Sequence, residues 1–411
     1  MTTARRPRNR KELLARAAAE LFRQRGYHAV GVKDIAAAAG VTGPAVYRHF
    51  ENKQDVLAHV VLAGVDTIGA VVDEATSTFA DKPEKASRAV LERLAELSVA
   101  NREITALWRW QGHHLDEANR AELRRRVGSA RRAWTRLIIR CRPDITDAEA
   151  ELLCWASLSV FGSVADHRVS LPRRRFEQLL VELAGAVLAA TVPSGVSSPT
   201  ADEEWRRGSP GATSRREELL TIATTLFRER GFHDVSMEEI GAAAGIAGPS
   251  VYRYFPSKAD IMLAAAYRMG DRLMVGARRA VATASDPTDA LHRIVESYVD
   301  ITLHPDGVPM RYADELINVP DRDRKELVAV QRGYVAEWVR LLRTVAPWLD
   351  EPAARITVQA ALTIVNDLPR TRRVNARPGL TAELTALAFT VLATDVSSGT
   401  RPPDEEQPGT N

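Results

Sequence analysis

Two thirteen-residue stretches decide the fold: VTGPAVYRHFENK at residues 41–53 and IAGPSVYRYFPSK at residues 246–258. They lie 205 positions apart and form the centre of a longer repeat. Aligned without gaps at that offset, residues 12–55 and 217–260 are identical at 23 of 44 positions. Chance does not produce such agreement, so this chain of 411 residues carries the same structural unit twice.

The repeat continues more faintly beyond these segments. At an offset of 204, Trp134 matches Trp338, and the run 187–189 matches 391–393. The chain is therefore two copies of one unit that agree at their start and diverge afterwards. Residues 192–214 are rich in Pro, Ser, Gly and charge, which predicts a flexible linker, and residues 396–411 are predicted to be a disordered tail.

Hydrophobic spacing within each copy predicts helices. Apolar residues recur at positions 14, 17, 18, 21 and 22, which form one helix face, and the second copy repeats the pattern from Leu219 to Phe227. Residues 148–165 and 352–368 are long and apolar enough to be buried helices, and no segment alternates with period two. The predicted fold class is all-α.

In the first copy, Gly26 is predicted to end the first helix, because glycine accepts the left-handed backbone that closes many helices. The second helix is expected to face inward with Val32, Ile35 and Ala39. It would end at Gly40, where a second glycine permits a sharp turn. Two helices at such a turn are the beginning of a helix-turn-helix.

A third helix is predicted over residues 43–50. Thr42 would be its N-cap, and Pro44 would lie in its first turn, where the missing N–H of proline costs nothing. Val46 and Phe50 then share a face directed at the core. A third element this short fits the major groove of DNA, so the segment is interpreted as a recognition helix.

The other side chains of the third helix suit DNA. Tyr47 offers a hydroxyl and Lys53 a cation to phosphate, and Ala45 offers a methyl group to a thymine methyl. Arg48 and His49 can donate to base edges or to phosphates. The expected ligand is double-stranded DNA.

A basic arm, RRPRNRK at residues 5–11, precedes the first helix. Arg5 and Arg6 are predicted to grip the DNA backbone or enter the minor groove. The plainer alternative is a solvated tail, and Ala-rich amphipathic helices occur in any helical bundle. Agreement of two copies at the turn glycine, the proline and the Tyr-Arg-x-Phe run favours DNA binding.

Residues 21–57 and 226–262 resemble the DNA-binding signature of the TetR family of bacterial transcriptional regulators, and the whole chain resembles the tandem members of that family in actinobacteria. The resemblance implies a three-helix DNA-binding head and a helical body that binds a small molecule. It carries the DNA contacts onto Thr42, Gly43, Pro44, Ala45, Tyr47, Arg48, His49 and Lys53, and in the second copy onto Ala247, Gly248, Pro249, Ser250, Tyr252, Arg253, Tyr254 and Lys258. Because Ala247 replaces the predicted cap Thr42, we expect the recognition helix of the second copy to be less stable by about 1 kcal/mol.

These inferences divide the chain into six parts. We predict a DNA-binding head over 1–57, a ligand-binding and dimerisation body over 58–191, a linker over 192–214, a second head over 215–262, a second body over 263–395 and a tail over 396–411.

Two fused units can provide in one chain the two heads that a homodimer places about 34 Å apart on a palindrome. We therefore predict an intramolecular pseudo-dimer, held by a four-helix seam of residues 146–167, 176–191, 351–368 and 381–394. Further self-association is left open.

The heads differ in charge: residues 1–60 carry eleven Lys and Arg against five Asp and Glu (+6), and residues 205–265 carry eight against seven (+1). An asymmetric operator is expected, with more phosphate affinity in the N-terminal head.

The bodies contain candidate residues for a ligand pocket. They are Trp108, Trp110, His113, His114, Trp134, Trp155 and Phe161 in the first copy, and Tyr298, Arg311, Tyr312, Glu315, Asn318, Tyr334, Trp338 and Asn366 in the second. Plain core packing is the competing explanation for each aromatic. Adjacent histidines diverge on a helix, so no metal site is predicted. The resemblance, which includes residues 311–342, implies an acyl-CoA, fatty-acid or sterol-like effector.

The composition bounds the remaining alternatives. With 27% charged residues, no apolar leader and no convincing membrane span, the sequence predicts a soluble cytoplasmic protein, and its two cysteines are expected to be reduced. It lacks a Walker A loop, HExxH and GxSxG, which argues against an enzyme and against a cofactor. The predicted function is a ligand-released repressor. An architectural DNA-binding protein without an effector is the alternative.

Overall fold

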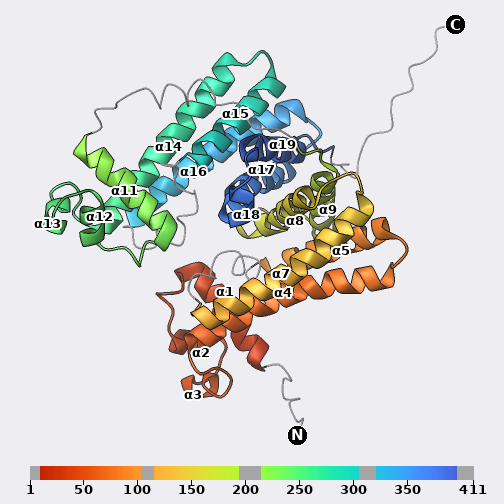
Figure 1. Cartoon of the computed structure of the whole chain (residues 1–411), viewed down its shortest axis with the longest axis horizontal. Helices are drawn as coiled ribbons and strands as arrows, with labels where there is room; N and C mark the ends of the chain where they lie inside the picture. Colours follow the sequence, from red (N-terminus) through yellow and green to blue (C-terminus); the bar gives the residue numbers. More distant parts are fainter. Residues whose placement is uncertain (1–9, 103–114, 194–213, 305–320, 396–411) are drawn as a thin grey trace.

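The computed structural model describes residues 10–102, 115–193, 214–304 and 321–395, and every regular element within those ranges is a helix, as the sequence predicts. The two copies repeat the same order of helices, except that the second adds the short α18 (Arg372–Asn375) before its last helix (Figure 1). Each copy begins with a three-helix head. The first head contains α1 (Arg10–Arg25), α2 (Val32–Ala38) and α3 (Gly43–Val46), and the second contains α11 (Arg215–Arg230), α12 (Met237–Ala243) and α13 (Gly248–Val251).

Longer helices form the bodies. The first body has α4 (Lys53–Thr78), α5 (Pro83–Ala100), α7 (Glu117–Cys141), α8 (Asp147–Gly162), η2 (Ser163–Ala165) and α9 (Arg173–Ala189). The second has α14 (Lys258–Thr283), α15 (Pro287–Leu303), α16 (Asp321–Val345), α17 (Glu351–Asp367), η4 (Leu368–Arg370), α18 (Arg372–Asn375) and α19 (Leu380–Leu392). Because α4 and α14 run without interruption from head to body, the divisions drawn at residues 57 and 262 fall within single helices.

Local sequence explains where these helices begin and end. Gly26 and Gly231 have φ values of 75° and 90°, which close α1 and α11 in the backbone region that glycine tolerates. At the start of α4 the Asn52 side chain accepts a hydrogen bond from the Asp55 amide at 3.0 Å. Ser257 does the same for Asp260 at the start of α14, at 3.3 Å. Both long helices are thus capped at the point where head meets body.

Each head is built around a small apolar core. In the first head Leu14, Phe22, Ile35, Val46 and Phe50 are buried together, which confirms the predicted inward faces of all three helices. This core also takes in Leu115 from the body and is separate from the main core. The core of the second head is instead continuous with the main core of the molecule.

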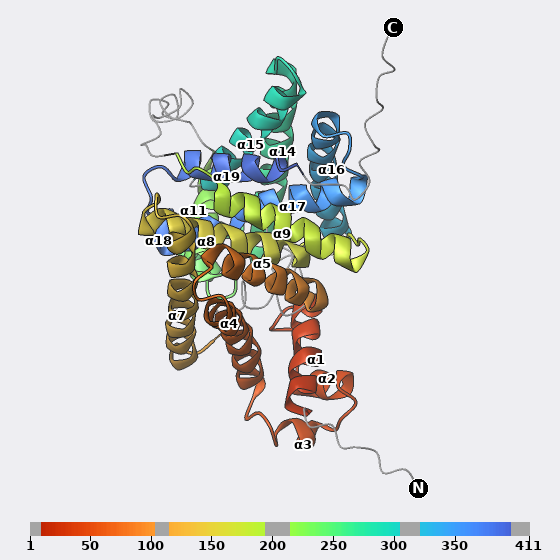
Figure 2. The ribbon, with the colours of Figure 1, turned by 90° about the vertical axis from the view of Figure 1, so that its right-hand side faces the viewer.

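Four helices join the two copies. Helices α8 and α9 of the first body pack against α17 and α19 of the second (Figure 2), so the predicted last two helices of each copy do meet. Both α8 and α17 are buried along most of their length, mainly by apolar residues. We call this four-helix contact the seam.

Two of the described helices, α4 and the α8–η2 segment, are long and apolar enough to cross a membrane by length and composition, which the sequence analysis did not anticipate. Their apolar residues belong to the cores just described, and core helices of this kind pass the same test. The two cysteines are free thiols, as expected, and burial raises the pKa of Cys154 to about 12.

Candidate nucleic-acid interface

The turn of each helix-turn-helix is made by a glycine with positive φ. Gly40 has φ 65° and Gly245 has φ 68°. Beside them the Val41 amide donates to the Ala36 carbonyl, and the Ile246 amide donates to the Gly241 carbonyl, both at 2.9 Å. The same backbone hydrogen bond therefore sets the direction of α3 and of α13.

The recognition helices are shorter than predicted. We expected the recognition helix of the first head over residues 43–50, but its regular helix ends at Val46. The recognition helix of the second head ends at the matching Val251. The His49 amide donates to the Val46 carbonyl three residues back at 2.9 Å, which is the tighter pattern of a final turn. The chain then directs Phe50 into the core before α4 begins.

The predicted caps also differ from the structure. Thr42 occupies the N-cap position of α3 with extended backbone, but its side chain makes no capping hydrogen bond. Ala247 occupies the same position before α13. Since the hydroxyl of Thr42 caps nothing, the loss of about 1 kcal/mol predicted for Ala247 was wrong.

Most of the predicted DNA-contacting side chains are exposed on the outer surface of their head. Tyr47 and Tyr252 are 58% and 49% exposed, so both rings are open to a partner outside the head. The other exposed positions are Thr42, Pro44, Arg48, His49, Ala247, Pro249, Arg253 and Tyr254, while Gly43, Ala45, Gly248 and Ser250 are half-buried. Arg5 and Arg6 lie outside the described residues.

The two lysines predicted to meet phosphate have partners within the protein. Lys53 Nζ donates to the Tyr27 carbonyl at 2.8 Å and lies 4.1 Å from the centre of the Tyr27 ring. Lys258 Nζ donates to the carbonyls of Phe232 at 2.8 Å and Val235 at 2.6 Å. Burial lowers the pKa of both ammonium groups. Each lysine thus ties the start of a long helix to the loop between the first two helices of its head.

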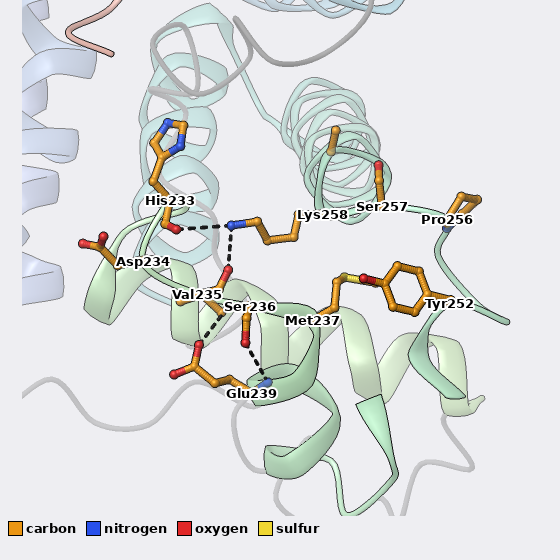
Figure 3. Close-up of a pocket in the computed structure, with 11 residues that line it drawn as sticks. His233, Asp234, Val235, Ser236, Met237, Glu239, Tyr252, Pro256, Ser257 and Lys258 are labelled. Atoms are coloured by element: carbon orange, nitrogen blue, oxygen red, sulfur yellow. Dashed lines mark hydrogen bonds between the residues drawn. The ribbon is translucent and has the colours of Figure 1, made fainter. Parts of the chain in front are cut away.

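An open groove of about 570 Å³ lies beside the recognition helix of the second head. Figure 3 shows Lys258 and Ser257 on one side of it, Tyr252 at its end, and the start of α12 along its floor. Ser236 and Glu239 form a reciprocal capping box there, with the Glu239 amide donating to Ser236 Oγ at 3.1 Å. The groove does not follow from the sequence, although the Ser-x-x-Glu pattern at 236–239 is the signature of the capping box.

The recognition helix lies at a different distance from the preceding helix in each of the two heads. A Cβ added to Gly241 in α12 would lie 3.0 Å from Gly248 Cα and 3.0 Å from the Ile246 carbonyl oxygen. The first head has Ala36 at the matching position, and a Cβ added to Gly43 there would meet nothing within 4 Å. One methyl group therefore separates α2 from α3 more widely than α12 from α13.

The predicted pocket residues fall into three groups. In the second body Tyr298, Tyr334 and Trp338 pack together with ring centres 5.6–6.1 Å apart, and Tyr298 Oη donates to Asn366 Oδ1 at 3.0 Å. In the first body Trp134 and Phe161 are buried and Trp155 is half-buried. The remaining candidates lie outside the described residues: Trp108, Trp110, His113, His114, Arg311, Tyr312, Glu315 and Asn318.

The exposed recognition surfaces, glycine turns and buried Val–Phe pairs define two helix-turn-helix DNA-binding heads. Comparison with known families agrees: the model for bacterial regulatory proteins of the tetR family matches residues 14–60 and again residues 219–265. Both heads belong to that family, and the chain carries two such units in tandem.

Curated relatives include the transcriptional activator FasR of Mycolicibacterium smegmatis, 32% identical over 28% of this chain, and the transcriptional repressor KstR2 of Rhodococcus jostii, 34% identical over 34%. The chain covers only 54% and 64% of these two relatives. Among solved structures, AibR in complex with isovaleryl coenzyme A and operator DNA aligns with 42% of this chain and 97% of its own, at 18% identity and a TM-score of 0.37.

Proposed function

We propose that the protein is a transcriptional regulator of the cytoplasm that binds operator DNA with both heads and is released by a small-molecule effector. The observation that carries this proposal is the pair of exposed recognition surfaces, each held by a buried Val–Phe pair, within one chain. The named relatives include a repressor and an activator. We propose repression, and the family's regulatory character gives no reason to propose a catalytic role.

We propose further that one chain acts as a pseudo-dimer across the seam. An ion pair in the seam supports this, because it needs one residue from the first unit and one from the second. Arg175 Nη1 donates to Asp350 Oδ2 at 2.6 Å, whereas the residues that match Arg175 and Asp350 at the offset of 204 are Gly379 and Thr146. A seam of two identical copies would lack this ion pair. Such exposed pairs contribute little affinity and act mainly on partner choice.

The operator that we propose is imperfectly palindromic. Its half-sites meet His49 and Ala45 in one head and Tyr254 and Ser250 in the other. The closer packing of α13 on α12 adds a difference in shape to this difference in side chains. Selection of bound fragments from random DNA tests the proposal, because it should return two unlike half-sites at one fixed separation.

The effector that we propose is a small hydrophobic, acyl-CoA, fatty-acid or sterol-like molecule. The aromatic cluster of Tyr298, Tyr334 and Trp338 supports this class, since these three large side chains are buried together in the second body and Tyr298 donates to Asn366 beside them. Native mass spectrometry of protein purified from its own host would reveal a bound molecule. DNA binding that no host extract weakens would favour the architectural alternative.

Stoichiometry separates the pseudo-dimer from a conventional dimer of chains. We expect one chain per operator and a footprint that covers both half-sites. Two chains per operator, each with one head engaged, would refute the pseudo-dimer while leaving DNA binding intact.

A further inference from the structure

The loops that follow the first helix of each head meet at two equivalent histidines. We call residues 26–31 and 231–236 the junction loops. The ring centres of His28 and His233 are 4.4 Å apart, with 45° between the ring planes. These residues match at the repeat offset of 205, so each touches its own counterpart, as happens at the twofold axis of a symmetric dimer.

Each histidine ring packs against the aromatic ring of the residue before it. The His28 ring meets the Tyr27 ring edge-on at 5.5 Å, and the His233 ring meets the Phe232 ring edge-on at 5.4 Å. The carbonyls of Tyr27 and Phe232 accept the ammonium hydrogen bonds already described. A continuous set of contacts therefore joins the start of α4 to the start of α14 through Lys53, Tyr27, His28, His233, Phe232 and Lys258.

The surroundings of the pair favour neutral imidazoles. Burial lowers the pKa of His28, and the positive charge of Lys53 lowers it further. Burial likewise lowers the pKa of His233, followed by the influence of His28 and of Lys258. The carboxylate of Asp234 acts on both rings in the opposite direction and favours their protonation.

We propose that the junction loops dock the two heads on each other as one unit while the imidazoles are neutral, and that protonation of His28 and His233 releases them. The inference rests on the proposed function, because its consequence is read in DNA binding by both heads. Docked heads present α3 and α13 at one separation, so the spacing of the half-sites is enforced. Released heads remain joined through the seam and accept other spacings.

The direction of the pH effect follows from proton linkage. Since the docked pair has lowered pKa values, the docked state binds fewer protons than the released state. Docking is therefore complete above the ordinary imidazole value of 6.5 and weakens as the pH falls below it. Two imidazolium rings at this separation would repel each other and both neighbouring lysines.

The test measures the affinity ratio between the selected operator and one with a single extra base pair between its half-sites. Such an insertion turns one half-site by about 36° and moves it by about 3.4 Å. We expect a ratio of roughly tenfold or more at a pH of about 8, falling to below roughly threefold at about 5.5. A ratio that does not change with pH would overturn the inference.

Variants separate the junction from other titrating groups. The double variant His28→Gln, His233→Gln should give the same ratio at both pH values, and persistence of the native pH effect in it would contradict the inference. Asp234→Ala introduces the residue that the first loop has at the matching position, Ala29. It should move the transition to lower pH, because the carboxylate that favours the protonated rings is lost. His292→Gln, on α15 in the second body, should leave the pH effect on the ratio unchanged.

Failure of the proposed function would look different. If the footprint covered a single half-site at every pH, binding by both heads would be refuted and the spacing ratio would have no meaning. A two-site footprint with a pH-independent ratio would refute the junction alone. Because both histidines are exposed, their substitution is not expected to unfold either head, which circular dichroism checks.

Discussion

Replacing Lys258 with methionine tests whether the lysines at the head–body boundary hold the protein together or hold DNA. Methionine keeps an apolar stem and removes the ammonium group. Lys258 Nζ makes two short bonds to the carbonyls of Phe232 and Val235, whereas Lys53 Nζ makes one to Tyr27. The equivalent variant Lys53→Met is therefore the matched comparison within the same chain.

The structure gives the expected size of each effect. At about 1 kcal/mol for each hydrogen bond of a half-exposed donor, Lys258→Met should destabilise residues 231–236 by about 2 kcal/mol, and Lys53→Met should destabilise residues 26–31 by about 1 kcal/mol. Hydrogen exchange of the amides in these loops reports the local change. We expect roughly thirtyfold faster exchange in the second loop and roughly fivefold in the first.

The salt dependence of DNA binding then decides between the two roles. A side chain that neutralises one phosphate contributes about 0.9 to the slope of log affinity against log salt concentration. We expect both lysine variants to bind DNA more weakly with an unchanged slope, and Arg253→Met, which removes an exposed recognition-surface cation, to reduce the slope by about 0.9. A reduced slope in Lys258→Met together with unchanged hydrogen exchange would refute a structural role for Lys258.

Three further outcomes follow from other contacts. Gly241→Ala places a methyl group 3.0 Å from Gly248 Cα, so it should lower the free energy of unfolding in urea by about 1–3 kcal/mol. The reverse change in the first head, Ala36→Gly, should cost at most about 1 kcal/mol. Equal effects would contradict the closer packing of α13 on α12. Glu383→Leu leaves Arg377 without the carboxylate that it grips at 2.5 and 2.7 Å, and should cost about 3 kcal/mol by the same measurement, with a loss below about 1 kcal/mol as the contrary result. The Ser236 backbone amide and then Arg230 donate to the Glu239 carboxylate and lower its pKa from 4.5 to about 2. This carboxylate therefore stabilises the head above pH 4.5 and loses its effect as the pH falls toward 2. An NMR titration should show a higher pKa for Glu239 in Arg230→Met, and no rise would exclude Arg230 as a cause of the shift.

Much of the fold can be predicted from the sequence because it is encoded locally. Gly26 and Gly40 mark helix ends through backbone geometry that few other residues accept, and the structure has positive φ at both. Val46 and Phe50 are four residues apart and meet in the core, as helix periodicity requires. The gapless repeat then transfers each of these features to the second copy.

Other features could not be predicted because they depend on groups that are distant in sequence. Lys53 donates to a carbonyl 26 residues earlier in the chain, whereas the sequence pattern and the family resemblance both pointed only to a phosphate partner. The contact between His28 and His233 requires both copies to be placed in space. The early end of α3 depends on how Phe50 enters the core, which a helical repeat pattern does not specify.

The seam explains how the second head can have a charge balance of only +1 and still serve in the proposed operator complex. Once the first head is bound, the second head meets its half-site as part of the same molecule, at an effective concentration that reaches the millimolar range for short connections. Weak phosphate affinity in the second head is then tolerable, because the seam and the junction loops provide proximity. A homodimer has no such freedom, since a change in one head is a change in both. Divergence of Lys33 to Glu238 is what this freedom allows, and we expect reversal by Glu238→Lys to strengthen binding to unselected DNA more than to the selected operator, which competition assays at fixed salt would measure.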